Sequence, residues 1–513
     1  MSRINSPVKP KINLDLSDPS ITPLHRAGMA GLWMTLNQLE KIYPIPAERV
    51  GHLSWSLTAH SISISWEGED FAALDWLFKE SFQISEEGLI SFTGLNPETM
   101  NFETRLSMHL GIKNTFLQHN KFFKSSGSES KDFIIDGKRI NIKYKKAKYY
   151  KHQNFAKDLC NKNGELFNNT IGIRGWLYPG AVIRHYTFPS QTNFEESIVL
   201  AIALAFAPVA CRYLFVRSQM QIEAIKYALV IPEVINLELF AQCYSNSNRL
   251  SYHDFFVSSL GEAGLKCISY IASKITNKYF YKKCEVISFS EVDWSSFQNT
   301  RNEIISVSVN KEAIYYYKLS CIYFPEYRVI YEEKSKKYII VGDFIRGIIA
   351  NNLIDSLPWW TNFITRLTQD DLLKHIFFQY QGFYKMIQKT DLNIESQQIF
   401  IKACHEALKI RYAKIYERKK DDEYAQIERE NIRIASQLRR CTNSENFRKF
   451  ISEFWGKTGQ LSTLQEHWEL LLPIISGQSG WKLARDLTFI ALASYPKNKK
   501  QENNSLEEPQ RNN

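Results

Sequence analysis

A change of pattern near residue 358 most limits how this chain can fold. Before it, runs of β-branched and aromatic residues alternate with helical segments, as expected of a mixed α and β body. After it, the β-rich runs stop and helix signals take over, which is typical of a helical bundle. With 513 residues the chain is long enough for several domains. The sequence predicts an α+β protein with an N-terminal extension (1–20), a mixed α/β body with β-hairpins (21–357), an all-α bundle (358–496) and a disordered tail (497–513).

Helix start signals mark the bundle. Two capping boxes, Thr368 with Asp371 and Thr442 with Glu445, predict the first residues of two helices. The segment 395–440 is charged and nearly free of glycine and proline, so it should form one or two helices. The bundle would then hold four or five helices.

Three segments of the body predict strand pairs. Alternation over 52–66 slips once, which fits either one bulged strand or two strands. In 133–144 two β-rich runs flank Asp136-Gly137, a dipeptide suited to a tight hairpin turn. The segment 327–341 predicts another hairpin with a longer, polar tip.

Two apolar segments of the body predict buried helices. Residues 198–211 are apolar throughout, but fourteen residues interrupted by Pro208 fall short of the roughly 20 that span a bilayer. The segment 22–40 carries Ala27, Gly28, Ala30 and Gly31, small residues that let a helix approach another backbone closely. No export signal is visible at the N-terminus, and the eight cysteines are scattered, so we expect a cytoplasmic protein with reduced thiols and no membrane partner.

Positive charge is concentrated between Lys113 and Asp158. This stretch holds twelve Lys or Arg and four acidic residues, whereas the whole chain has a net charge of only +10. In the predicted hairpin, isoleucines and a tyrosine alternate with Arg139, Lys143 and Lys145, so one face is apolar and the other cationic. The asymmetry indicates a polyanionic partner. A solvated lysine-rich face is the alternative.

Three sets of candidate nucleic-acid contacts follow. The hairpin cations are expected to contact phosphates: Lys138, Arg139, Lys143, Lys145, Lys146, Lys148 and Lys151. Tyr144, Tyr149 and Tyr150 would stack on bases unless they are core residues, which is the favoured interpretation. Polar side chains of "KNTFLQHNKFFKSSGS" (113–128), which ends in a serine-rich tip after Phe123, are expected to read base edges, because amides both donate and accept. This reading set contains Asn114, Gln118, Asn120, Lys121, Lys124 and Ser125, with Arg184 and His185 as second choices.

The third set lies in the bundle. It comprises Lys409, Arg411, Lys414, Arg418, Arg439 and Arg440. A rival interpretation is that these cations pair inside the bundle with Glu417, Asp421, Asp422, Glu428 and Glu430. Sequence alone leaves both open.

Motifs for catalysis are incomplete. The GKT at 456–458 lacks the first glycine of a phosphate-binding loop, and His405-Glu406 lacks the second histidine of a zinc-protease helix. We therefore expect no catalytic residue, no metal and no cofactor.

Four quoted stretches resemble a known family. They are "TPLHRAGMAGLWMTL" (22–36), "FLQHNKF" (116–122), "GWLYPGAVIRH" (175–185) and "LAFAPVACRYLF" (204–215). Together they resemble the large subunit of a type I CRISPR Cascade complex, most closely the short form of I-B-like systems, including those carried by transposons. The motifs cover residues ~20–220, and the rest matches by layout.

The resemblance implies a role in RNA-guided antiviral defence or transposition. Such subunits recognise the protospacer-adjacent motif in duplex DNA, help to open it and channel the displaced strand. The implied partners are guide RNA, target DNA, the backbone and handle-binding subunits, and the small subunits that the bundle resembles. A helicase-nuclease and a transposition adaptor are alternative further partners. A stand-alone RNA-binding protein, or an enzyme with an unrecognised site, remains a competing interpretation.

Overall fold

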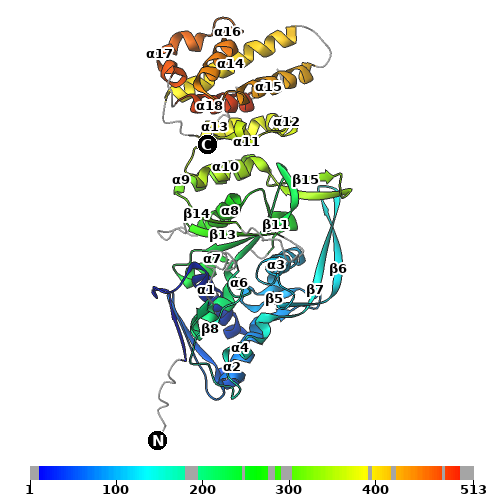
Figure 1. The fold of residues 1–513 in the computed structure, drawn as a ribbon, viewed down its shortest axis with the longest axis vertical. Coiled ribbons are helices and arrows are strands. Elements are labelled where there is room, and N and C mark those ends of the chain that lie inside the picture. Colours follow the sequence, from blue (N-terminus) through cyan, green and yellow to red (C-terminus); the bar gives the residue numbers. More distant parts are fainter. Residues whose placement is uncertain are drawn as a thin grey trace, which may run out of the picture. The chain divides into compact units, whose positions relative to one another are not determined.

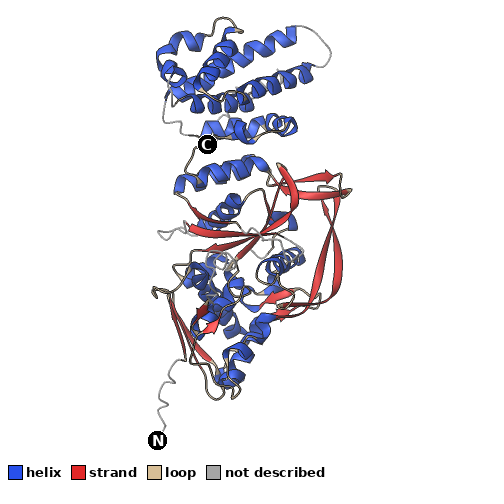
Figure 2. Ribbon diagram, in the orientation of Figure 1, coloured by secondary structure: helices blue, strands red, loops and turns tan. Residues whose placement is uncertain are grey.

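The computed structural model describes residues 11–179, 194–244, 249–274, 283–290, 303–390, 395–417, 423–476 and 480–496. The chain forms two compact units. One consists of residues up to 310 together with 326–343, and the other of 311–325 together with the residues from 344 onward. The first unit mixes helices and strands, and the second is helical where it is described (Figure 2). The predicted α+β class is therefore confirmed.

A seven-stranded sheet forms the centre of the first unit. Its strand order is β14–β13–β11–β10–β16–β15, and the short β12 pairs with β10. The bounds are β10 (Arg212–Ser218), β11 (Gln221–Pro232), β12 (Phe256–Val257), β13 (Lys283–Ser290), β14 (Ile304–Ser308), β15 (Tyr327–Glu332) and β16 (Lys337–Gly342). The β15–β16 pair confirms the hairpin predicted over 327–341.

Smaller sheets surround this centre. The segment 52–66 forms two strands, β2 (Ser54–Leu57) and β3 (Ser61–Ser65), so the second of the two alternatives is correct. The remaining strands are β1 (Ile12–Asp15), β4 (Phe82–Ile84), β5 (Ile90–Phe92), β6 (Phe123–Ile135), β7 (Lys138–Tyr150), β8 (Ile171–Gly172) and β9 (Glu195–Glu196). The helices are α1 (Pro23–Ile42), α2 (Asp70–Ser81), α3 (Phe102–Thr115), α4 (Ala156–Leu159), α6 (Ile198–Ala210), α7 (Leu237–Tyr244) and α8 (Leu260–Lys274).

The two predicted apolar helices pack against each other. Gly28 and Gly31 of α1 face the backbone of α6, where a Cβ added to Gly28 would lie 2.0 Å from the carbonyl oxygen of Ala203. Such an approach is open only to glycine. Helix α6 is almost entirely buried, as its composition predicts. Across the described residues, every helix is too short or too polar to cross a membrane.

His152 lies in an aromatic part of the core rather than on the surface. Its ring is 4.8 Å from that of Trp176 and 5.1 Å from that of Phe82, and both ring nitrogens lack a hydrogen-bond partner among the described residues. Burial lowers the pKa of His152 to about 3. Trp176 is almost equally buried.

His152 should make the protein less stable in acid. Because the pKa of His152 is lower in the folded chain than its usual 6.5, the unfolded chain takes up the proton first as the pH falls. Stability is therefore lost below pH 6.5. His152→Phe should reduce the dependence of unfolding free energy on pH, between pH 6 and 4, by about 1.4 kcal/mol per unit. Denaturant titrations measure this slope, with His60→Phe, an exposed site, as the control. An unchanged slope for His152→Phe would contradict the assignment.

The second unit packs its helices around α18. Helix α18 (Trp481–Ser494) is buried over most of its length and contacts α11 to α17. The other bounds are α9 (Lys311–Tyr323), α10 (Phe344–Ile354), α11 (Phe363–Arg366), α12 (Asp370–Phe378), α13 (Tyr380–Lys389), α14 (Glu395–Glu417), α15 (Glu423–Arg439), α16 (Ser444–Gly456) and α17 (Ser462–Ser476). The described helices of 358–496 outnumber the four or five expected, because short helices such as α11 leave no long periodic pattern.

Both predicted capping boxes are wrong in detail. Helix α12 begins after Gln369, and its cap has no side-chain hydrogen bond. Helix α16 is capped by Asn443, whose Oδ1 accepts a 2.8 Å hydrogen bond from the backbone N–H of Asn446. The cap therefore lies one residue beyond Thr442, and the N–H group that it satisfies is that of Asn446 rather than that of Glu445.

Candidate nucleic-acid interface

Strands β6 and β7 form a long two-stranded ribbon at one side of the first unit (Figure 1). Asp136 (φ 51°) and Gly137 (φ 71°) make the turn, as the sequence predicts for this dipeptide. The ribbon is longer than predicted, because pairing extends back to Phe123 and Tyr150. Two irregularities near Ser125 shift the register and carry the pairing past Gly127. The expected serine-rich loop is thus a strand, and the loop prediction is wrong.

One face of the ribbon is anchored in the protein core. Ile140, Tyr144, Ala147 and Tyr150 are buried, and the Tyr150 hydroxyl donates a 3.1 Å hydrogen bond to the carbonyl of Gln83. The core interpretation is therefore correct for Tyr144 and Tyr150. Tyr149 is half-buried.

The tip of the ribbon is held as well. The Tyr327 hydroxyl lies 3.2 Å from Oδ1 of Asp136, and the Lys138 ammonium lies 5.0 Å from the centre of the Tyr338 ring. Behind the tip, Phe133 stacks on Tyr252 with ring centres 5.7 Å apart. Contacts at both ends make the ribbon a fixed surface rather than a free arm.

Positive charge lies at the exposed positions of the ribbon. Lys138, Lys143, Lys145 and Lys148 are exposed, and none has an ion-pair partner among the described residues. The other three predicted phosphate contacts are paired with carboxylates: Arg139 with Asp132, Lys146 with Glu129 (3.2 Å) and Lys151 with Asp158 (2.7 Å). The seven predicted cations thus divide into four that lack a carboxylate and three whose charge is already offset.

Small residues lie across the ribbon from two of these lysines. Lys143 pairs with Ser130 and Lys145 with Ser128, while Lys146, whose charge Glu129 offsets, pairs with Gly127. Serine and glycine neither cover the ammonium groups nor neutralise them, and serine hydroxyls can donate to phosphate oxygens themselves. The arrangement leaves cations that are two to five residues apart along β7 open to a polyanion.

The predicted base-reading set is only partly accessible. Asn114 is 4% exposed at the end of α3, and its Oδ1 accepts a 2.8 Å hydrogen bond from Lys113, so it is withdrawn from contact with bases. Gln118 is half-buried, and its amide donates to the carbonyl of Asn114. The exposed members lie at and beside the start of β6: Asn120, Lys121, Lys124 and Ser125. Arg184 and His185 lie outside the described residues.

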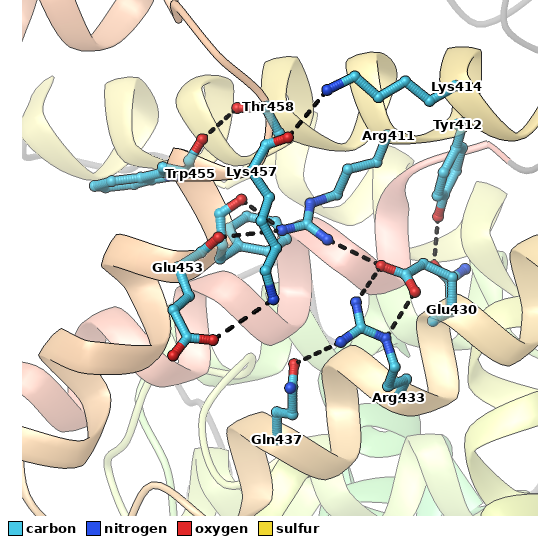
Figure 3. A network of polar contacts seen from close by, with 12 residues as sticks. Arg411, Tyr412, Lys414, Glu430, Arg433, Gln437, Glu453, Trp455, Lys457 and Thr458 are labelled. Carbon is cyan, nitrogen blue, oxygen red and sulfur yellow. Dashed lines mark hydrogen bonds and ion pairs between the residues drawn. The ribbon is translucent and has the colours of Figure 1, made fainter.

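In the bundle, Arg411 is a structural residue. Its Nη1 donates a 2.9 Å hydrogen bond to Oε1 of Glu430, and its Nη2 donates a 2.7 Å bond to the carbonyl of Phe454 (Figure 3). Arg433 donates to the same carboxylate. Burial raises the pKa of Glu430, but hydrogen bonds and charge from Arg433 and Arg411 outweigh it and keep the pKa below its usual value. Arg411 is therefore not available to nucleic acid, and the rival interpretation applies to it.

The other predicted cations of the bundle differ in exposure and in hydrogen bonding. Lys409 and Arg440 are exposed. Lys414 is exposed, and its ammonium donates a 3.0 Å hydrogen bond to the carbonyl of Lys457 (Figure 3). Arg439 is half-buried and donates to the carbonyl of Thr368. Arg418, Asp421 and Asp422 lie outside the described residues.

No metal site accompanies these surfaces in the described part of the chain, where no cluster of three or more His, Cys, Asp and Glu side chains could hold an ion. Seven of the eight cysteines are buried and all are unpaired with one another, as expected for core thiols, while Cys321 is exposed. Burial raises the pKa of Cys404 to about 12.

Comparison with known proteins places the chain in a family. The model of the DevT N-terminal domain matches residues 13–205, and the model of the DevT C-terminal domain matches residues 388–513. A "CRISPR-associated protein Cas8a1/Csx13" from Myxococcus xanthus (strain DK1622) is 24% identical over 94% of this chain and 88% of its own length. The chain belongs to the DevT family of CRISPR-associated proteins.

The family assignment confirms the resemblance to a type I Cascade large subunit. The I-B-like subtype and the transposon association stay predictions. In this DevT protein the N-terminal match includes α1, the first part of α6 and the whole β6–β7 ribbon, and the C-terminal match includes α14 to α18.

Proposed function

We propose that this protein is the non-catalytic large subunit of an RNA-guided Cascade complex that grips duplex DNA through the β6–β7 ribbon. It recognises the protospacer-adjacent motif, helps to open the duplex and stabilises the resulting R-loop in the cytoplasm. Its partners are guide RNA, target DNA and the other Cascade subunits. The observation that carries the proposal is a set of four exposed lysines within the DevT N-terminal match: Lys138, Lys143, Lys145 and Lys148. None of them is paired with a carboxylate in the described part of the chain.

The chemistry of the ribbon suits backbone contact rather than sequence reading. Lysine is a point charge that holds phosphates but carries no information about bases. In RNA-guided complexes base pairing with the guide supplies most of the specificity, and the protein reads only a short motif in the duplex. A fixed cationic surface with a few amides beside it meets that requirement.

The amides just before β6 are the proposed motif readers. Gln118 and Asn120 lie next to exposed Lys121 and Lys124, which would hold the duplex against them. Each good base contact contributes ~1–3 kcal/mol of discrimination. In the assembled complex, Asn120→Ala and Gln118→Ala should therefore lower the preference for the correct motif about 5- to 150-fold each. Competition binding between targets with correct and altered motifs measures it.

A matched control keeps this test specific. Asn163→Ala changes an exposed amide elsewhere in the first unit and should leave the preference intact. If both ribbon-side variants keep full preference while affinity for all targets is normal, the motif is read elsewhere. If the protein does not assemble with guide RNA and the other subunits, the proposed function itself fails, and tight binding of RNA by the isolated chain would then favour a stand-alone RNA-binding protein.

A further inference from the structure

A second hairpin extends the cationic ribbon and adds exposed aromatic surface. The β15–β16 hairpin meets the tip of β6–β7 through the contacts of Tyr327 with Asp136 and of Tyr338 with Lys138 (Figure 1). Its own turn contains the exposed Lys334 and Lys336, and Lys337 follows at the start of β16. The turn also holds the exposed Glu333, so the three lysines leave an excess of positive charge beside the tip of β6–β7.

Tyr331 supplies the exposed aromatic ring that the β6–β7 ribbon lacks. Its side chain is 53% exposed, and its ring meets that of its cross-strand partner Tyr338 edge-on at 5.3 Å. Tyr338 is in turn half-buried under the Lys138 ammonium. The edge contact supports the Tyr331 ring from one side while half of its surface stays open to solvent.

The hairpin is rigid enough to present this ring. Glu332, which follows Tyr331, pairs with Arg217 of β10 at 3.0 Å. Arg328, at the other end of β15, donates a 2.9 Å hydrogen bond to Oε1 of Gln219. A large exposed aromatic side chain on an anchored strand has little conformational entropy to lose on binding.

We propose that the β15–β16 hairpin is a stacking platform for an unpaired DNA strand, with Tyr331 as the base-stacking residue and Lys334, Lys336 and Lys337 as phosphate contacts. Exposed aromatic rings beside lysines are what binding of single strands requires, whereas the bases of an intact duplex are stacked inside and cannot reach a tyrosine. The choice of DNA rests on the proposed function. A duplex held on β6–β7 and then opened would release its displaced strand next to the adjoining hairpin.

The test uses the full-length chain and three probes of one sequence: a single-stranded DNA oligonucleotide, the corresponding RNA and the DNA duplex. Tyr331→Ala should weaken binding of the single-stranded DNA about 5- to 150-fold, the range for loss of one stacked base, and leave duplex binding unchanged. Tyr331→Phe keeps the ring and should bind as the unaltered chain does. Tyr315→Ala removes an exposed tyrosine of α9 and serves as the matched control.

The outcomes separate this platform from the proposed function. Equal loss on single strands and duplex, or no loss at all, would overturn the platform. Loss confined to RNA would overturn the assignment to DNA. Loss on single-stranded DNA in a chain that fails to assemble with guide RNA would support the platform and reject the Cascade role. In an assembled complex, Tyr331→Ala should weaken only targets that carry a displaced strand.

Discussion

Replacing Gly28 with alanine should destabilise the first unit by about 3 kcal/mol or more. The added Cβ would lie 2.0 Å from the carbonyl oxygen of Ala203 and 2.6 Å from its carbonyl carbon, both backbone atoms of a buried helix. Neither atom can move without separating α1 from α6, and overpacking of this kind typically costs 1–3 kcal/mol and sometimes more. The gain of about 1 kcal/mol in helix propensity does not offset it.

The same reasoning applies one turn further along α1. A Cβ on Gly31 would lie 2.1 Å from the carbonyl oxygen of Phe206, so Gly31→Ala should be similarly destabilising. Gly456→Ala is the matched control, because this helical glycine of α16 has no described atom within 4 Å of an added Cβ. It should be neutral or stabilise slightly. Denaturant midpoints measure all three, and a Gly28→Ala chain as stable as the unaltered one would disprove the close packing.

Much of this contact could be predicted from the sequence. Small residues at Gly28 and Gly31 and the apolar run 198–211 indicate that each helix is buried and closely packed. They do not show that the two helices pack against each other, because neither segment carries a pattern that identifies its packing partner. The pairing of α1 with α6 is a long-range contact that only the folded chain shows.

The ribbon illustrates a different limit of sequence reasoning. Asp136-Gly137 and the alternation after it predict the turn and the two faces. The strand from Phe123 onward is not predicted, because serine and glycine have low β-propensity and the strand exists only through its pairing with β7. Counting lysines also overstates the open charge, since Asp132, Glu129 and Asp158 neutralise three of the cations.

In the bundle, neighbouring cations have opposite environments. Lys409 and Arg411 are two residues apart, yet one is exposed and the other is held by Glu430 of the next helix. The partner is nineteen residues away along the chain, so neither charge pattern nor local spacing reveals it. The aromatic platform at Tyr331 was missed for a related reason. Its tyrosines and lysines lie within one short segment, 327–338, but their continuity with the ribbon depends on the contact between two distant hairpins.

The largest effect on function is expected from the four lysines that lack carboxylates. A protein that contacts 6–10 phosphates loses about 10³–10⁵ in affinity between 50 and 200 mM salt, since log affinity falls with a slope near −0.9 per phosphate. Replacing Lys138, Lys143, Lys145 and Lys148 with alanine removes four contacts. The slope should therefore become shallower by about 3.6, and the loss across this salt range about 100-fold smaller.

The central claim is that the β6–β7 ribbon holds duplex DNA in an assembled Cascade complex. The salt dependence of duplex binding by that complex tests the claim most directly. The four-lysine variant is compared with a variant of equal charge change at exposed lysines elsewhere, Lys41, Lys162, Lys283 and Lys318. The ribbon variant should bind duplex more weakly at 50 mM salt and show the shallower slope, while the control keeps the original slope. If the two variants have the same slope as the unaltered complex, the ribbon is only a solvated face and the DNA is held elsewhere.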